Sequence, residues 1–372
     1  MNIKLKESPE QKALFAAIGS KNREESFAAQ EAFAAFITPV VQTVLYQAST
    51  VGAVYVTKTF NEDDSPSIPL DLYFDEGTEF VQVWSQDIAG GLGTSHVEGM
   101  KEMKISTYNL QSAVSFNKAY ARKARLNVLE KAIQRMINEV IVKQERNAYV
   151  PMLLQAANGN INGVQNTFRS NTADIFGIDD LNKMITRMKR INQSFANGTP
   201  SNYQSKGLTN ILCSPEILEQ CRAMSYQPMN TYNGSTTTSG ATSIALPDTI
   251  RTEIFNSAGT KTLFNIQIAD VNELGINAKM NTLFDTLAGS TSYSKANGSG
   301  GAVFAATDEI VLGFDLSRDN LIRAVMVDQN GSETNVLPDN QFVDRQGKVG
   351  FWLSLDEGRV AVDARAQVGL IV

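Results

Sequence analysis

The chain has 372 residues, of which 42% are hydrophobic and 19% charged, and its formal net charge is −6. This length allows one large or two medium domains with a sizeable core. The acidic balance argues against a protein dedicated to reading nucleic-acid sequence. No window approaches the roughly eighteen consecutive apolar residues of a membrane span, and the first residues lack a signal-peptide core. We therefore expect synthesis in the cytoplasm and no membrane contact.

Residues 8–48 have the composition of a helical arm. Ser8 and Pro9 form a plausible helix entry, with the serine as cap and the proline in the first turn. The stretch 19–22 should break the helix, and Pro39 should end or kink the second piece. Large apolar residues recur near helical spacing, so one face of the arm needs a covering partner. The aromatic members of this face are Phe27, Phe33 and Phe36.

Residues 52–110 alternate apolar and polar positions like a long β-ribbon. Strands are predicted at 68–74 and 78–84, with a Gly-rich loop at 90–93 and a return strand at 103–108. A two-stranded ribbon cannot bury both faces against its own domain, so a neighbouring copy of the chain is the simplest cover. The ribbon residues expected to contact that neighbour are Tyr73, Phe74, Phe80, Trp84 and Leu92.

A long helix is predicted from Asn117 to Leu154. Between residues 117 and 149 it carries eight Lys or Arg and three Glu, so an acidic chain contains one basic helix. Two interpretations stay open: the basic side chains face packaged DNA, or they pair with acids on neighbouring subunits. The residues concerned are Arg122, Lys123, Arg125 and Arg135.

The second half of the chain mixes short strands and helices. A helix is expected at 178–195, and a strand at 207–213 should lead into a helix that Ser214 caps and Pro215 opens. Residues 230–305 are rich in Ser, Thr, Asn and Gly and predict a β-rich subdomain with exposed loops, including a strand at 263–268. The remaining strands are expected at 309–314, 321–327, 349–355 and 359–363, the last two joined by a tight turn at 356–359.

Residues suited to catalysis are scarce. His96 is the single histidine and lies beside a predicted loop tip, so neither a hydrolase triad nor a Cys/His zinc set can be assembled. Cys213 and Cys221 are expected to be buried thiols. The carboxylate pairs at 63–64 and 356–357 fall in predicted polar turns, which explains them without catalysis. We expect no enzyme activity, no metal and no cofactor.

The order of these elements resembles the major capsid protein of tailed double-stranded-DNA bacteriophages, the Hong Kong 97-type fold. Three pieces carry the resemblance: residues 101–108 followed by the helix from Asn117, the strand-to-helix step at 210–220, and the closing segment 349–366. The resemblance implies an α+β fold with an N-terminal arm (1–51), an extended β-hairpin loop (52–110), a peripheral domain with a spine helix (111–207), an axial domain (208–340) and return strands of the peripheral domain (341–372).

The resemblance also implies a function. Hexamers and pentamers of the chain would form an icosahedral shell around packaged double-stranded DNA, with a portal protein, a separate scaffolding protein and decoration proteins as partners. The chain would then reside in the virion, after assembly in the host cytoplasm. Two other structural roles remain as alternatives, an encapsulin-like shell around protein cargo and a phage tail or baseplate protein. The contents of the shell separate the first two, and rings or tubes would indicate the third.

Overall fold

A computed structural model describes residues 9–48, 51–61, 65–69, 102–123, 126–161, 164–196, 207–223, 262–298, 300–317, 319–328, 331–339 and 347–372. The described residues divide into two compact units. Unit 1 consists of the described residues within Met1–Ile68, Glu102–Tyr149 and Leu321–Val360. Unit 2 consists of the described residues within Pro69–Lys101, Val150–Asn320 and Ala361–Val372. Helices and strands occur in both, which confirms the α+β class.

The N-terminal arm forms two helices of unit 1, α1 (Pro9–Ile18) and α2 (Arg23–Ala48). Pro9 opens α1 and the break falls after Ile18, both as predicted. Helix α2, however, runs through Pro39 and does not end there. Burial of apolar side chains on both sides of the proline offsets the missing hydrogen bond. By length and composition alone, Arg23–Leu45 is apolar enough to cross a membrane, and 47% of its 18-residue apolar window is buried inside the structure.

The predicted long helix is in fact two helices, α4 (Lys118–Arg122) and α5 (Leu126–Asn158). Asn117 caps α4, and its side chain accepts a hydrogen bond from the Ala119 N–H at 2.9 Å. Lys123 leaves the helical conformation, with φ −88° and ψ 7°. The neighbouring residue types all favour helix, so local propensity gives no sign of this break. Helix α5 begins in unit 1 and continues past Tyr149 into unit 2.

The sheet of unit 1 has the order β1-β14-β16-β15, and β4 also pairs with β16. Its longest member, β16, corrects the sequence prediction, because residues 356–359 continue the strand where a hairpin turn was expected. Ten consecutive residues of β16 pair with β4, from Lys348 opposite Asn117 to Glu357 opposite Tyr108. The strands are β1 (Val56–Phe60), β4 (Tyr108–Asn117), β14 (Leu321–Met326), β15 (Asn335–Asp339) and β16 (Lys348–Ala361).

Gly358, which suggested the turn, serves a different purpose. A Cβ atom at this position would lie 2.8 Å from the Ser106 carbonyl oxygen and 2.9 Å from Ile105 Cγ2. Glycine is therefore required by the close approach of the 105–106 backbone to the strand.

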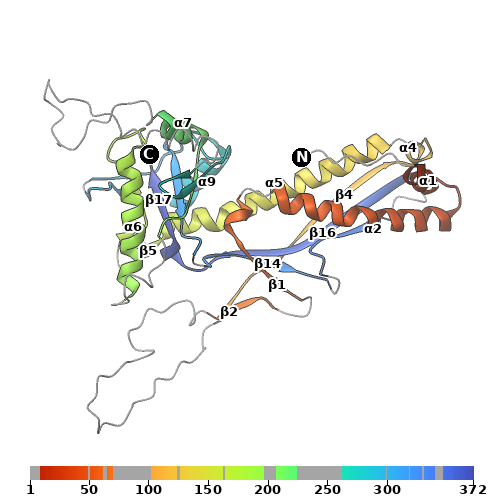
Figure 1. Cartoon of the computed structure of the whole chain (residues 1–372), viewed down its shortest axis with the longest axis horizontal. Helices are drawn as coiled ribbons and strands as arrows, with labels where there is room; N and C mark the ends of the chain where they lie inside the picture. Colours follow the sequence, from red (N-terminus) through yellow and green to blue (C-terminus); the bar gives the residue numbers. More distant parts are fainter. Residues whose placement is uncertain are drawn as a thin grey trace, which may run out of the picture. The chain divides into compact units, whose positions relative to one another are not determined.

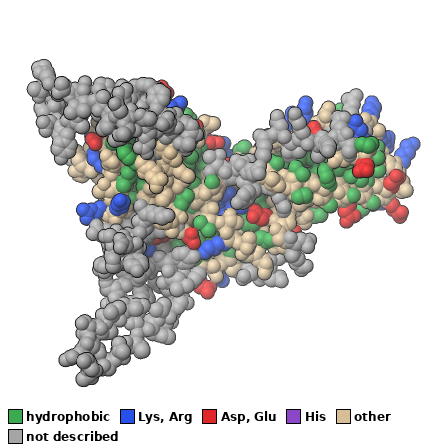
Figure 2. Space-filling model, in the orientation of Figure 1, with side chains coloured by type: hydrophobic (Ala, Val, Ile, Leu, Met, Phe, Trp, Pro, Cys, Tyr) green, Lys and Arg blue, Asp and Glu red, His purple; other side chains and the backbone are tan. Residues whose placement is uncertain are grey.

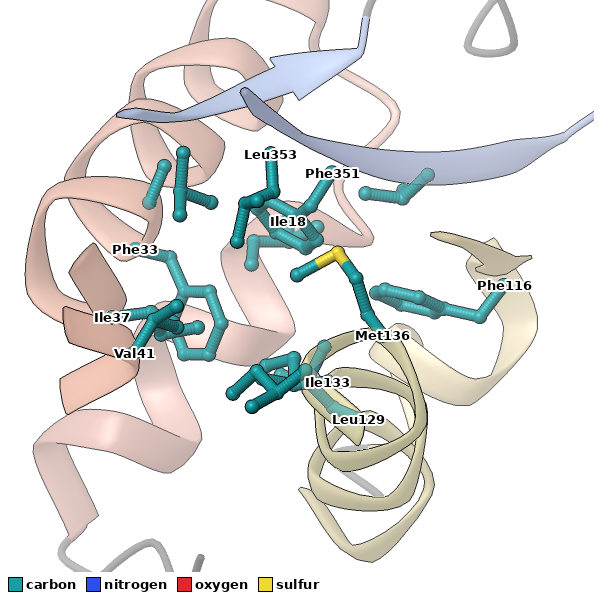
Figure 3. Close-up of a cluster of buried hydrophobic side chains, with 14 of the residues drawn as sticks. Ile18, Phe33, Ile37, Val41, Phe116, Leu129, Ile133, Met136, Phe351 and Leu353 are labelled. Carbon is teal, nitrogen blue, oxygen red and sulfur yellow. The ribbon is translucent and has the colours of Figure 1, made fainter. Parts of the chain in front are cut away.

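The core of unit 1 lies between α1, α2, α5 and the β4–β16 pair (Figure 1). Figure 3 shows side chains from these elements pointing toward one another. Phe33, Ile37 and Val41, each four residues after the last, form the inward face of α2. The ring of Phe33 packs against the ring of Phe351 in β16, with 5.7 Å between their centroids. The arm is therefore an integral part of the unit's own core.

The described base of the predicted ribbon is a two-stranded sheet of β2 (Ser67–Pro69) and β3 (Glu102–Lys104). The Ile105 N–H donates to the Pro66 carbonyl oxygen at 2.9 Å and extends the pairing. The predicted strand 78–84, the Gly-rich loop and nearly all of the strand 68–74 lie outside the described residues.

Unit 2 is built around a mixed sheet of order β7-β17-β13-β8-β10-β9. Its core combines these strands with α6 (Ile178–Ala196) and α7 (Pro215–Ala223). The strands are β7 (Thr167–Arg169), β8 (Asn210–Cys213), β9 (Thr262–Leu263), β10 (Ile266–Asp270), β13 (Ile310–Phe314) and β17 (Gln367–Ile371). The described residues of unit 2 also form β5 (Asn160–Ile161), β6 (Val164–Gln165), β11 (Ser292–Ser294), β12 (Gly301–Val303), α9 (Lys279–Ala288) and the 3-10 helix η4 (Ala364–Ala366). The 3-10 helix η1 (Gly52–Val54) belongs to unit 1.

Several predictions for unit 2 are confirmed, among them α6, β13 and the step from β8 to α7. Ser214 caps α7, accepting from the Ile217 N–H at 3.2 Å. The single strand expected at 263–268 is wrong: Phe264 and Asn265 both have positive φ (51° and 62°) and form the turn of the β9–β10 hairpin. The final strand β17 joins the sheet of unit 2, so the 341–372 segment divides between the two units.

Candidate functional site

The surface of α2 combines a buried face with exposed aromatic residues. Phe27 and Phe36 are 39% and 44% exposed, whereas Phe33 is 2% exposed. The expectation that Phe33 contacts a neighbouring subunit is therefore corrected, since its ring is already covered within its own unit. Phe27 and Phe36 remain available to a partner. Figure 2 shows hydrophobic side chains along the part of unit 1 where α2 and α5 lie.

The other predicted contact residues cannot be placed. Tyr73, Phe74, Phe80, Trp84 and Leu92 lie outside the described residues, as do His96 and the Asp63–Asp64 pair.

Three of the four predicted basic residues are exposed in unit 1. Arg122 and Lys123 lie on and just after α4, and Arg135 lies on α5. The Nε–H of Arg122 also donates to the Gly19 carbonyl oxygen at 2.9 Å, where it ties α4 to the α1–α2 connection. Arg125 falls outside the described residues.

A buried cluster of charged residues surrounds Glu357 of β16, whose side chain is 0% exposed. Its Oε2 accepts from Arg323 Nε at 2.9 Å, from Gln144 Nε2 at 3.3 Å and from Arg359 Nη2 at 3.4 Å. Its Oε1 accepts from the Tyr108 hydroxyl at 3.0 Å. The hydrogen bonds from these four donors thus offset the free-energy cost of removing the carboxylate from water. The sequence prediction that this carboxylate belongs to a polar surface turn is wrong.

Two tyrosines complete this cluster. The Tyr55 hydroxyl donates to the Ala148 carbonyl oxygen at 2.5 Å, and the Arg359 guanidinium lies 5.0 Å above the Tyr55 ring. Burial is the main cause that raises the pKa of Tyr55, and burial followed by the charge of Glu357 raises the pKa of Tyr108. Both hydroxyls therefore stay protonated and act as hydrogen-bond donors.

In the described part of unit 2, the buried carboxyl groups of Asp180 and Glu309 make hydrogen bonds near the starts of α6 and α7. Asp180 Oδ2 accepts from the Gly177 N–H and from Ser170 Oγ, each at 3.1 Å. The Ser214 hydroxyl donates to Glu309 Oε2 at 2.6 Å. Burial raises the pKa of both carboxyl groups, and Glu216 and Asp174 add to the effect at Glu309. These hydrogen bonds fix helix ends to the sheet, which is a structural role.

The described residues contain no group of three or more His, Cys, Asp or Glu placed to hold a metal ion. Cys213 and Cys221 are both buried and form no disulfide, as the sequence predicted. Burial raises the pKa of the Cys221 thiol to about 12. That thiol is therefore not a nucleophile near neutral pH.

The comparisons with known proteins give a fold. No protein-family model and no curated protein matches the sequence. Solved structures do match, among them the capsid of an empty GTA particle, with 10% identity, a TM-score of 0.51 and coverage of 87% of this chain and 89% of that one. The capsid of the cyanophage P-SCSP1u has 13% identity, a TM-score of 0.46 and coverage of 85% and 86%. The encapsulin SrpI of Synechococcus elongatus PCC 7942 has 10% identity, a TM-score of 0.37 and coverage of 73% and 74%.

The likeness to the GTA particle capsid spans most of both chains and shows that this chain has a capsid fold. The Hong Kong 97-type fold expected from the sequence is thereby confirmed.

Proposed function

We propose that this chain is the major capsid protein of a tailed bacteriophage and forms hexamers and pentamers of an icosahedral shell around double-stranded DNA. The observation that carries the proposal is the capsid fold, shared over 87% of the chain with the GTA particle capsid. Large closed shells are built from many copies whose surfaces cover one another. The portal, scaffolding and decoration proteins named above belong to this proposal as partners.

The surface of unit 1 supports assembly. Phe27 and Phe36, which are 39% and 44% exposed on α2, offer apolar surface to a neighbouring copy. The exposed Arg122, Lys123 and Arg135 offer positive charge to a DNA backbone or to acids of a neighbouring copy.

Electron microscopy of the purified chain, with and without its scaffolding protein, tests the proposal. Closed shells or isolated hexamers and pentamers are the expected result. Nuclease treatment of shells recovered from infected cells then separates a DNA-filled capsid, whose nucleic acid is protected, from a compartment that holds protein cargo. A chain that stays monomeric at every concentration, with and without scaffold, would refute the shell.

A pair of matched variants tests the proposed contact surface. Replacing Phe27 and Phe36 together by serine removes two exposed rings, so shells should form more slowly or at higher concentration while unit 1 stays folded. The control replaces Ala28 and Ala35, exposed positions on the same helix, by serine. Equal assembly by both double variants would show that these rings do not contribute.

A further inference from the structure

One surface of unit 2 combines exposed isoleucines with the polar side of α7. Ile175 and Ile276 are each 55% exposed. The backbone N–H that follows Ile175 donates to Gln220 Oε1 of α7 at 2.6 Å. Glu216 Oε2 lies 3.2 Å from the place that a Cβ atom would take on the glycine before Ile276. The two isoleucines therefore flank α7 along one side.

The segments that form this surface carry an excess of negative charge. Together, residues 174–176, 215–223 and 273–279 contain four acidic residues and two basic ones. Asp174 and Glu216 are exposed, and both lie close enough to Glu309 to raise its pKa, after the larger effect of burial. We call this surface the acidic face of unit 2.

A second surface of unit 2 combines an exposed valine with basic residues of α6. Val164 of β6 is 51% exposed. The Arg187 guanidinium donates to the carbonyl oxygen of the residue after Val164, which places this valine beside α6. Lys183 and Arg190 lie four residues before and three after Arg187, on the same side of the helix. Residues 183–190 contain four basic residues and no acidic one, and we call this surface the basic face.

The two faces lie toward opposite ends of α6 (Figure 1). Helix α7 contacts the residues that precede α6, whereas β6 lies beside its second half. At 1.5 Å per residue, about 14 Å of helix separates Ile178 from Arg187. This exceeds the Debye length of about 8 Å at physiological ionic strength, so the exposed charges of one face are largely screened from those of the other.

We propose that the acidic face of one copy binds the basic face of the next copy, head to tail. The acidic face cannot cover itself in a two-fold contact, because like charges would then meet. Contacts between two different faces of one chain can close into rings, as the hexamers and pentamers of the proposed function require, and the inference rests on that function. Ile175, Ile276 and Val164 supply apolar area at the contact, and the charges set its direction.

Charge reversal on each face, alone and combined, tests the contact through the chain concentration at which hexamers, pentamers or shells form in sedimentation velocity. Glu216→Lys with Glu219→Lys reverses the acidic face, and Lys183→Glu with Arg190→Glu reverses the basic face. Each pair should raise that concentration about tenfold, or about 1.4 kcal/mol, whereas the chain with all four substitutions should assemble as the wild type does. The two pairs change the net charge in opposite directions, so a loss in both cannot come from net charge.

Lys295→Glu, which reverses an exposed charge outside both faces, is the control and should assemble as the wild type does. Ile276→Ser changes no charge and should also raise the assembly concentration, so it decides the matter should a reversed pair fail to fold. Unchanged assembly of the reversed pairs, or of Ile276→Ser, would overturn the contact and leave the proposed function standing. A loss in one pair without rescue in the combined chain would indicate a partner other than this chain and would also overturn it. A wild type that never assembles, with or without scaffolding protein, would refute the proposed function and this contact with it.

Discussion

Replacing Phe33 by alanine tests whether the N-terminal arm belongs to its own unit. The ring is 2% exposed and lies 6.2 Å from Phe15 and 5.7 Å from Phe351, measured between centroids. Loss of the buried ring and the cavity left behind should lower the free energy of unfolding of unit 1 by about 3–5 kcal/mol. Phe36→Ala, three residues away on the exposed side, should cost about 1 kcal/mol or less.

Urea unfolding followed by tryptophan emission measures both values. The chain has two tryptophans, and replacing Trp84 by phenylalanine leaves Trp352 of β16, in unit 1, as the single reporter. The midpoint should fall for Phe33→Ala while the dependence on urea stays constant. If Phe33→Ala cost no more than Phe36→Ala, the arm would not be packed on unit 1, and the reasoning that removed Phe33 from the contact surface would be refuted.

Three further substitutions probe the rest of the structure. Gly358→Ala places a Cβ against a backbone carbonyl and should destabilise unit 1 by about 1–3 kcal/mol in thermal unfolding. At the control position, Gly177→Ala, the new Cβ would have no neighbour closer than 3.7 Å, so this substitution should cost little. Equal costs would exclude the close backbone approach as the reason for glycine at position 358. Glu357→Gln leaves buried guanidinium groups without their counter-charge and should cost about 3–5 kcal/mol. Glu333→Gln, which changes the half-buried partner of Arg323, should cost about 0–1 kcal/mol. Urea unfolding that ranks the two variants the other way would contradict the cluster. Because burial raises the pKa of Glu309 above its unfolded value, its contribution to stability declines as pH rises through the folded pKa. Glu309→Gln should remove that slope at pH values above the unfolded pKa of about 4.3, and an unchanged slope would show that this carboxyl does not cause it.

Elements with local signals could be predicted from the sequence. Proline in the first turn of α1, serine before α7 and acidic residues at the start of α6 each act within a few residues of the helix end that they mark. The strands β13 and β14 are short apolar runs between polar segments, and their periodicity is equally local. In all these cases the stabilising contact and the sequence signal lie in the same stretch of chain.

Elements whose structure depends on residues distant in the sequence could not be predicted in this way. The residues at 356–359 have turn composition, yet β4 pairs with the first two of them and Arg323 neutralises Glu357 from another strand. Phe264 and Asn265 reverse the chain although the usual Asn-Gly signal is absent. The polar cluster was missed for the same reason, because its members are 249 residues apart in sequence at the Tyr108–Glu357 contact.

The contact surface shows where sequence patterns reach their limit. Helical periodicity indicates that one face of a helix is covered, but it does not indicate whether residues of the same chain or of another copy cover that face. On α2 this distinction separates Phe33 from Phe36, which are adjacent in the pattern, since rings from α1 and β16 pack on the first whereas the second remains 44% exposed. In the proposed shell, both kinds of cover are expected on one helix. Assembly surfaces are therefore to be sought among the large apolar residues that remain exposed after the single chain has folded, and among the described side chains of α2 these are Phe27 and Phe36.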